Sequence, residues 1–214
     1  MELKTQGIVI RNLCINEADN VLIILTETHG KLSVISKSTK KATSKLQPCT
    51  ELFTLNEYQL IKTGTNSKYL KMINARQLKN HENIRKELKK IGLAYLIAEL
   101  LDKFLPVEEV NEEVFALAKN AFAMLDDKET LEVAAVEMMF KLKLLELSGF
   151  DIGADKVFLK NGLTSLKTKD FIEGNRVTEI DASYVKEINS VLDHYIVNVL
   201  EEELVSKKMM KDWK

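Results

Sequence analysis

The sequence lacks the features that mark membrane, secreted and low-complexity proteins. No stretch of its 214 residues approaches the roughly 20 consecutive apolar residues that span a bilayer, and no long apolar run follows a basic leader at the start. Only 2 prolines and 8 glycines stand against 45% hydrophobic residues, which excludes a Pro/Gly-rich disordered chain and favours long helices. Cys14 and Cys49 are too few for a disulfide framework, so a reducing compartment fits. We expect a soluble, cytoplasmic, globular protein.

Catalytic motifs are also missing. The sequence contains no Gly-rich phosphate loop, no Gly-x-Ser-x-Gly elbow and no His-Glu-x-x-His helix. His29, His81 and His194 share no metal-ligand spacing, and adjacent carboxylates such as Glu108 and Glu109 point in different directions on a helix. We therefore expect no catalytic residue, no cofactor and no bound metal, and predict a protein that is not an enzyme. A nuclease-like hydrolase with a site assembled from distant residues is the alternative, and it would reveal itself by Mg²⁺-dependent products.

Charge is distributed unevenly along the chain. Residues 1–79 hold 12 Lys/Arg and 6 Asp/Glu, a net charge of +6, while the remainder holds 19 basic and 26 acidic residues, a net charge of -7. A basic segment of this size indicates a polyanion-binding domain. The alternative interpretation is that the two segments simply attract each other.

The first 79 residues show the pattern of short strands. Runs of β-branched and apolar residues at 7–15, 21–28, 31–36, 51–62 and 68–75 are separated by turn formers, among them His29-Gly30 and residues 64–67. Five antiparallel strands in about 75 residues predict an OB-fold barrel, a fold that commonly binds single-stranded nucleic acid. The strand pattern alone fits an SH3-like barrel nearly as well.

From residue 80 the apolar period becomes helical. Leu93, Ile97, Leu100 and Phe104 form one stripe, with an adjacent stripe at Ile84, Leu88, Ile91 and Tyr95. Asn111 is a candidate N-cap for a second helix, and Gly149 a candidate stop for a third. Residues 151–180 lose the period and predict a loop or small hairpin, after which a stripe of Tyr184, Ile188, Val191, Tyr195 and Val199 predicts a last helix continuing towards Trp213. The fold class is α+β: an OB-fold domain at 1–79 and an all-helical domain at 80–214.

The strongest binding signal is a run of lysines without acidic residues between Gly30 and Thr50. It contains Lys31, Lys37, Lys40, Lys41 and Lys45, whose ammonium groups suit DNA phosphates. The hydroxyls of Ser38, Thr39, Thr43 and Ser44 add donors for phosphate oxygens. Tyr58 and Tyr69 would stack bases only if they face outwards. The alternatives are a merely solvated loop and tyrosines that belong to the core.

The order of residues in this N-terminal part resembles the RecO family. In that family a glycine opens and an arginine closes the first strand, a Glu-x-Asp pair precedes an apolar strand ending in threonine, and a Gly-Lys turn follows. The matching residues here are Gly7, Arg11, Glu17, Asp19, Thr26, Gly30 and Lys31. The family's basic loop and Leu-Gln-Pro resemble Lys37, Lys40, Lys41, Leu46, Gln47 and Pro48, with Ser38 where the family has glycine. Residues 93–106, 111–125 and 140–150 resemble its helical core, and Ser206-Lys207-Lys208 its ending.

The resemblance implies a mediator of DNA repair and homologous recombination, associated with the nucleoid. Such a protein binds single- and double-stranded DNA, anneals complementary strands and helps load RecA onto strands coated by single-strand-binding protein, together with RecR. Many members carry a four-cysteine zinc element after the helical core. Residues 151–180 here contain no cysteine, so this chain is a variant that cannot build that site there.

Two sets of candidate contact residues follow. The DNA-binding candidates are Arg11, Lys31, Lys37, Lys40, Lys41 and Lys45, with Lys207 and Lys208 in the basic tail. The resemblance also implies that the helical domain binds the acidic, apolar tail of single-strand-binding protein, for which Phe140, Lys141, Lys143 and Leu144 are the candidates. The alternative function is a protein-binding adaptor whose basic barrel docks an acidic partner without touching DNA.

Overall fold

A computed structural model describes residues 2–17, 19–37, 39, 44–62, 67–127, 133–150 and 182–212. The loop or hairpin expected at 151–180 lies outside these residues. The chain divides into two compact units. Unit 1 comprises residues 1–81 and 98–115, and unit 2 comprises residues 82–97 and 116–214. The domain boundary near residue 79 stays a prediction.

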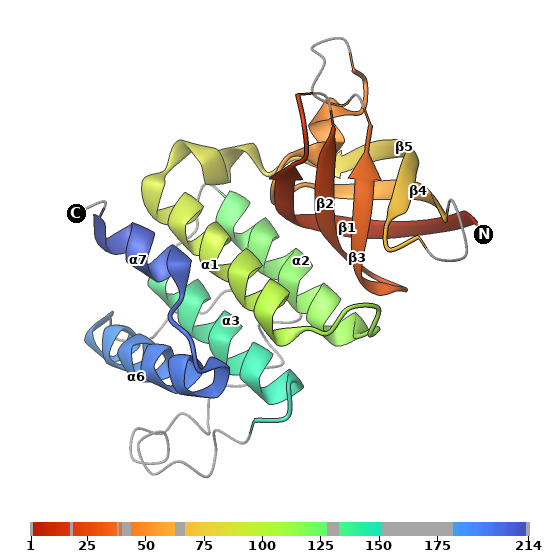
Figure 1. The fold of residues 1–214 in the computed structure, drawn as a ribbon. Coiled ribbons are helices and arrows are strands. Elements are labelled where there is room, and N and C mark those ends of the chain that lie inside the picture. Colours follow the sequence, from red (N-terminus) through yellow and green to blue (C-terminus); the bar gives the residue numbers. More distant parts are fainter. Residues whose placement is uncertain are drawn as a thin grey trace. The chain divides into compact units, whose positions relative to one another are not determined.

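Unit 1 is built on a closed five-stranded barrel (Figure 1). Its strands are β1 (Glu2–Cys14), β2 (Asn20–Thr26), β3 (Gly30–Ser36), β4 (Leu55–Lys62) and β5 (Leu70–Lys79), in the spatial order β1-β2-β3-β5-β4. All neighbours pair antiparallel except β3 and β5, which pair in parallel through Val34 and Leu70. The barrel confirms the predicted OB-fold architecture and the α+β class.

Alternation along the strands fills the barrel interior. The buried core consists of Val9, Leu22, Ile24, Leu32, Val34, Tyr58, Leu60 and Met72. Tyr58 is therefore a core residue and not an outward stacking platform. Its hydroxyl donates to the carbonyl of Cys49 at 2.9 Å and accepts from Asn56 Nδ2 at 2.7 Å. Burial raises the pKa of the Tyr58 phenol, so the hydroxyl stays a donor.

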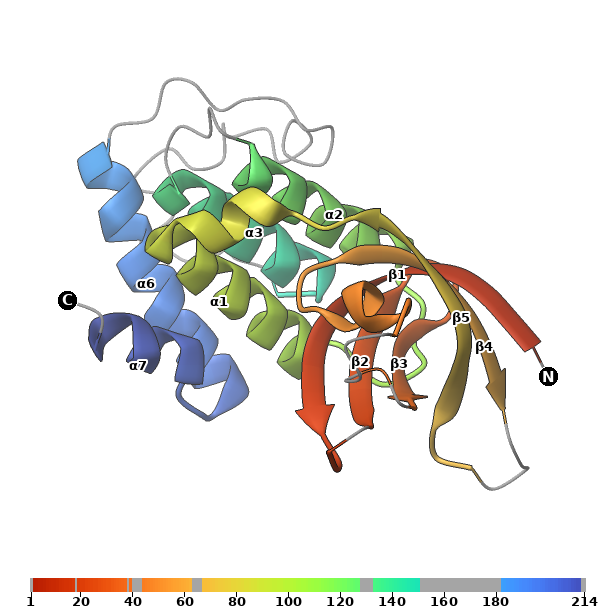
Figure 2. The same cartoon turned by 90° about the horizontal axis from the view of Figure 1, so that it is seen from above.

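A short 3₁₀ helix, η1 (Gln47–Thr50), interrupts the β3–β4 connection and lies at one end of the barrel (Figure 2). Leu46 and Leu52 on either side of η1 pack against the barrel core. Side chains from two strands hold its backbone, because Gln77 donates to the Pro48 carbonyl at 2.9 Å and Asn12 to the Thr50 carbonyl at 2.7 Å. The second half of the lysine-rich connection is thereby fixed to the barrel.

Unit 2 is helical. After η2 (Glu82–Lys86), the helices are α1 (Leu88–Phe104), α2 (Glu112–Asp126), α3 (Val133–Leu147), α6 (Ala182–Leu200) and α7 (Val205–Asp212); the ends of α1 and α2 nearest the connection between them belong to unit 1. In unit 2, α3 packs against α6. Within the described residues, every helix falls short of the length and apolar character needed to cross a membrane.

Two helix ends lie where the capping residues in the sequence predict them. The Asn111 side chain accepts from the Val114 amide at 3.0 Å, which confirms the predicted N-cap. Gly149 has a φ of 83°, and the Phe150 amide donates to the Leu145 carbonyl at 3.0 Å, so α3 ends in the predicted glycine stop.

Three predictions about the helices are wrong. The wide apolar face formed by the two stripes predicts that both are buried, but Leu88 and Tyr95 of the stripe at 84–95 are exposed. The last helix does not run on to the C-terminus: Glu201 adopts a φ of 55°, which breaks it between α6 and α7. The buried face of α6 is also rotated from the predicted stripe, since it is formed by Val185, Ile188, Leu192 and Ile196.

Candidate nucleic-acid interface

The β3–β4 connection presents part of the predicted basic loop to solvent. Lys37 and Lys45 are exposed, on either side of the segment that carries Lys40 and Lys41, which lie outside the described residues. Thr39 is fully buried, with its hydroxyl 3.0 Å from that of Ser36. Its predicted role as a phosphate donor is therefore wrong in this conformation, because both hydroxyls are turned into the fold.

Arg11 and Lys31 converge on one carboxylate. Asp102, in the part of α1 that belongs to unit 1, lies 3.0 Å from the Arg11 guanidinium and 3.0 Å from Lys31 Nζ. Lys31 also donates to the Asp102 carbonyl and is buried, whereas Arg11 remains largely exposed. Lys31 therefore holds unit 1 together, while Arg11 keeps part of its guanidinium in solvent.

The Gly30-Lys31 turn packs directly against the connection between α1 and α2. Gly30 has a φ of 66°, and a Cβ built on it would lie 2.2 Å from the Glu109 carbonyl oxygen. The Glu108 amide donates to the Lys31 carbonyl at 3.1 Å, and Lys31 forms a parallel β-bridge with Val107. Only glycine accommodates both the left-handed backbone and this close approach. The structure thus gives a packing reason for two residues of the motif.

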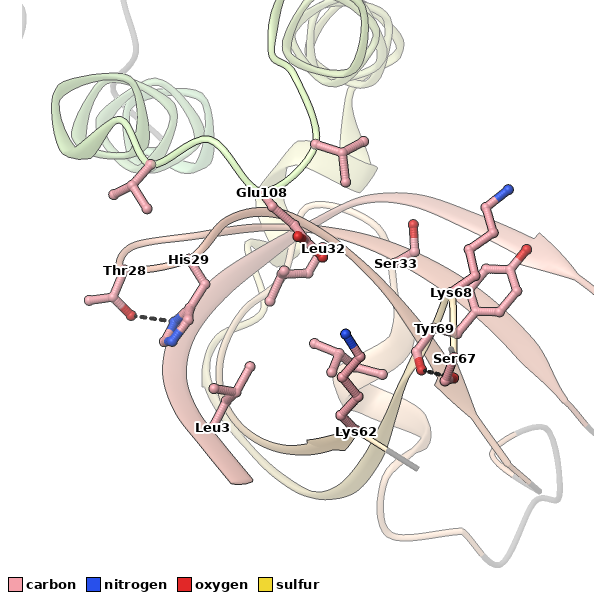
Figure 3. A pocket seen from close by; sticks show the side chains of 13 residues that line it. Leu3, Thr28, His29, Leu32, Ser33, Lys62, Ser67, Lys68, Tyr69 and Glu108 are labelled. Carbon is pink, nitrogen blue, oxygen red and sulfur yellow. Dashed lines mark hydrogen bonds between the residues drawn. The ribbon is translucent and has the colours of Figure 1, made fainter. Parts of the chain in front are cut away.

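A cleft of about 330 Å³ opens in unit 1 beside the contact between this turn and the α1–α2 connection (Figure 3). Its lining comes from the start of β1, the β2–β3 turn, β3, the end of β4 and the segment before β5, together with the α1–α2 connection. Tyr69 lines it and is partly exposed, unlike Tyr58. Sequence reasoning singled out Tyr69 but not the cleft, because the lining segments are distant in the chain. The signal it passed over is the pair of lysines, Lys62 and Lys68, that flank the β4–β5 turn.

The four candidates for partner binding lie on α3 and are all buried. Phe140 and Leu144 belong to the core of unit 2. Lys141 is fully buried, and its Nζ contacts Glu137 Oε1 at 2.5 Å and Asp193 Oδ1 at 2.6 Å. Lys143 pairs with the exposed Glu146 at 3.0 Å. Whether this segment binds a partner stays a prediction.

Lys207 of α7 joins the same buried cluster. It pairs with Glu137 and, at 2.9 Å, with Asp193, so two lysines and two carboxylates alternate between α3, α6 and α7. Burial alone would raise the pKa of Glu137, but the charges of Lys141 and Lys207 outweigh it and lower that pKa. Lys208, the other tail candidate, is exposed. The two tail lysines therefore differ, and Lys207 stabilises unit 2.

The histidines show no shared site. His29 Nδ1 lies 2.8 Å from the Thr28 hydroxyl, His81 Nδ1 donates to the Phe53 carbonyl at 2.6 Å, and His194 Nδ1 donates to the Ser190 carbonyl at 2.8 Å. Among the described residues, no group of three or more His, Cys, Asp or Glu side chains is arranged to hold a metal ion.

Comparison with known proteins agrees with this architecture of an OB-fold barrel followed by helices. Residues 1–78 match the family described as "Recombination protein O N terminal", and residues 85–156 match "Recombination protein O C terminal". The chain belongs to the RecO family. This chain has no cysteine after residue 49.

Individual relatives carry the name "DNA repair protein RecO". The protein from Caldanaerobacter subterraneus subsp. tengcongensis is 30% identical over 150 residues, which are 69% of this chain and 58% of the relative. The relative from Dehalococcoides mccartyi strain ATCC BAA-2266 is 31% identical over 150 residues, 70% of this chain and 57% of the relative. That from Alkaliphilus metalliredigens is 29% identical, over 70% of this chain and 59% of the relative. The matches thus span less than three fifths of each of these relatives.

Proposed function

We propose that this chain is a cytoplasmic mediator of DNA repair and homologous recombination that binds DNA without cutting it. It binds single- and double-stranded DNA, anneals complementary strands and, with RecR, helps load RecA onto strands coated by single-strand-binding protein. The observation that carries the proposal is the acid-free lysine run between Gly30 and Thr50, with Lys37 and Lys45 exposed on an OB-fold barrel. Membership of the RecO family supports the same function.

Four lysines of this run are the proposed phosphate contacts: Lys37, Lys40, Lys41 and Lys45. Four contacts to a single strand give a slope of log affinity against log salt near -3, from about -0.7 per contact. Lys31 is excluded from the set because it is buried against Asp102. Phosphates carry no base identity, so these contacts weaken or strengthen binding to all sequences alike.

The decisive experiment changes Lys40 and Lys41 to alanine. We expect the salt slope to fall in magnitude by roughly 1 to 2 and annealing of strands coated by single-strand-binding protein to slow, because about two phosphate contacts are lost. Thermal unfolding should be nearly unchanged, since substitutions in a solvated loop, as the sequence predicts for Lys40 and Lys41, usually alter stability by within about 0.5 kcal/mol. Lys208→Ala is the comparison, because this exposed lysine of unit 2 belongs to the basic tail that is the alternative DNA contact.

Two results would contradict this assignment. If the loop variant keeps its affinity and slope while Lys208→Ala loses both, the tail and not the loop is the DNA-binding surface. If the unmodified protein fails to shift bare oligonucleotides at low salt yet binds an acidic protein, the barrel is a protein adaptor.

Unit 2 is the proposed contact for the acidic tail of single-strand-binding protein. The predicted contact residues on α3 are buried, so binding there requires local opening of the helices. A tail peptide that binds in this way accelerates amide hydrogen exchange along α3. Binding without any change in α3 exchange would move the partner site elsewhere.

A further inference from the structure

The cleft in unit 1 combines apolar walls with a small number of polar groups. Leu32, Leu70 and Val110 form part of the apolar lining, and Ser33 and Ser67 add hydroxyls. Its volume of about 330 Å³ lies at the lower end of the roughly 300–1,000 Å³ typical of small-molecule sites. A space of this kind suits one planar, partly polar group better than an extended chain.

An aromatic ring and one cation lie together at one side of the cleft, and a second cation stands near its middle (Figure 3). The Lys68 ammonium lies 5.9 Å from the centroid of the Tyr69 ring. Figure 3 shows the Lys62 side chain pointing into the middle of the lining residues, across from Leu3. Among the described residues, no carboxylate forms an ion pair with Lys62 or Lys68. An aromatic face beside unpaired cations is the combination that single-strand-binding surfaces use for bases and phosphates.

Glu108 places an acceptor on the opposite side. The Glu108 amide donates to the Lys31 carbonyl, and this hydrogen bond fixes the α1–α2 connection at Glu108. The Glu108 backbone has a φ of 62° there. A carboxylate accepts hydrogen bonds from the exocyclic amino group of cytosine or adenine but offers nothing to the corresponding oxygen of thymine.

We propose that this cleft receives one unstacked base of a DNA single strand. The base stacks on Tyr69, an amino-bearing base donates to Glu108, and Lys62 and Lys68 neutralise the flanking phosphates. The inference rests on the proposed DNA binding and adds to it a site that recognises the base, whereas the lysine run contacts only phosphates.

The first test separates bases from phosphates. A short oligodeoxycytidine and a strand of abasic sugars carry the same phosphates, so only the former fills the cleft. We expect the protein to prefer the base-bearing strand by roughly 5- to 150-fold, the range for one base stacked on an aromatic side chain. Tyr69→Ala should abolish most of this preference, while Tyr69→Phe, which keeps the ring, should retain it within about twofold.

The second test concerns Glu108. Oligodeoxycytidine should bind roughly 10- to 150-fold more tightly than oligodeoxythymidine, the effect of one hydrogen bond to a charged group. Glu108→Ala should remove this ratio. Glu109→Ala is the matched control, because it removes a neighbouring carboxylate that does not line the cleft. Glu109→Ala should raise the affinity for both strands through charge alone and leave the ratio unchanged.

The outcomes also distinguish this site from the lysine loop. If Lys40→Ala with Lys41→Ala lowers the salt slope while Tyr69→Ala keeps the full preference for bases, the loop binds DNA and the cleft does not. If the preference depends on Tyr69 but the loop variant binds normally, the cleft stands and the loop assignment fails. Lys62 and Lys68 can also be acetylated chemically in the presence of either ligand. If an acidic peptide protects these lysines and single-stranded DNA does not, the cleft belongs to a protein partner and the proposal is overturned.

Discussion

Replacing Lys141 by methionine tests the buried charge cluster of unit 2. The side chain is fully buried, and its ammonium contacts Glu137 at 2.5 Å, Asp193 at 2.6 Å and Asn189 at 3.3 Å. Methionine keeps most of the aliphatic volume, so packing is largely preserved. The variant leaves two carboxylates to share Lys207. Breaking a buried pair on one side costs about 3–5 kcal/mol, and we expect a loss of that size.

The matched control is Lys143→Met, two residues along the same helix. Among the residues that the structure describes, its ammonium pairs only with Glu146, whose side chain is 54% exposed. Pairs of this type contribute about 0–1 kcal/mol, so Lys143→Met should unfold at nearly the wild-type urea concentration. Urea titration followed by far-UV circular dichroism measures both variants, because unit 2 supplies most of the helix.

A second substitution and a pH series isolate the electrostatic part. Adding Glu137→Gln to Lys141→Met removes one of the two carboxylates that have lost Lys141. The double variant should therefore lose less stability than the two single variants combined. The pKa of Glu137 is lowered in the folded protein. Its ionised form therefore stabilises the fold at pH values above the ordinary carboxyl pKa, and this stabilisation is lost as the pH falls. Without Lys141 that pKa rises, and the cost of Lys141→Met should shrink between about pH 7 and pH 4. A cost no larger than that of Lys143→Met, or one independent of pH, would refute the buried cluster.

Three further outcomes are expected. Gly30→Ala should speed hydrogen exchange throughout the barrel, because a left-handed backbone costs an alanine about 1–2 kcal/mol and the added Cβ clashes with Glu109. In Gly149→Ala the added Cβ meets no atom within 4 Å, so this variant should show the backbone cost alone. Elemental analysis of the purified protein should find no zinc, since residues 151–180 contain no cysteine, and one zinc per chain lost on chelation would disprove this. Incubation with ATP or DNA and Mg²⁺ should give no product, and turnover that tracks with point variants would show an enzyme.

The sequence by itself determined the five strands and two helix ends, because these depend on neighbouring residues. Strand alternation and turn formers are read over fewer than ten positions, and Asn111 and Gly149 act on backbone within their own helix turns. The helical face of α6 was less well predicted. Its apolar residues are spread more widely than one stripe, and packing against α3 selected Leu192 and Ile196 for burial beside the predicted Ile188.

Tertiary structure alone decided which charges are available for binding. A lysine has the same sequence signature whether it faces solvent or a carboxylate that lies far along the chain. Lys31 meets Asp102 across 71 positions and Lys141 meets Asp193 across 52, so both are buried, while Lys37 and Lys45 stay exposed. The cleft at Tyr69 likewise depends on the approach of the α1–α2 connection to the barrel. Coulomb attraction depends on distance in space, which only the folded chain determines.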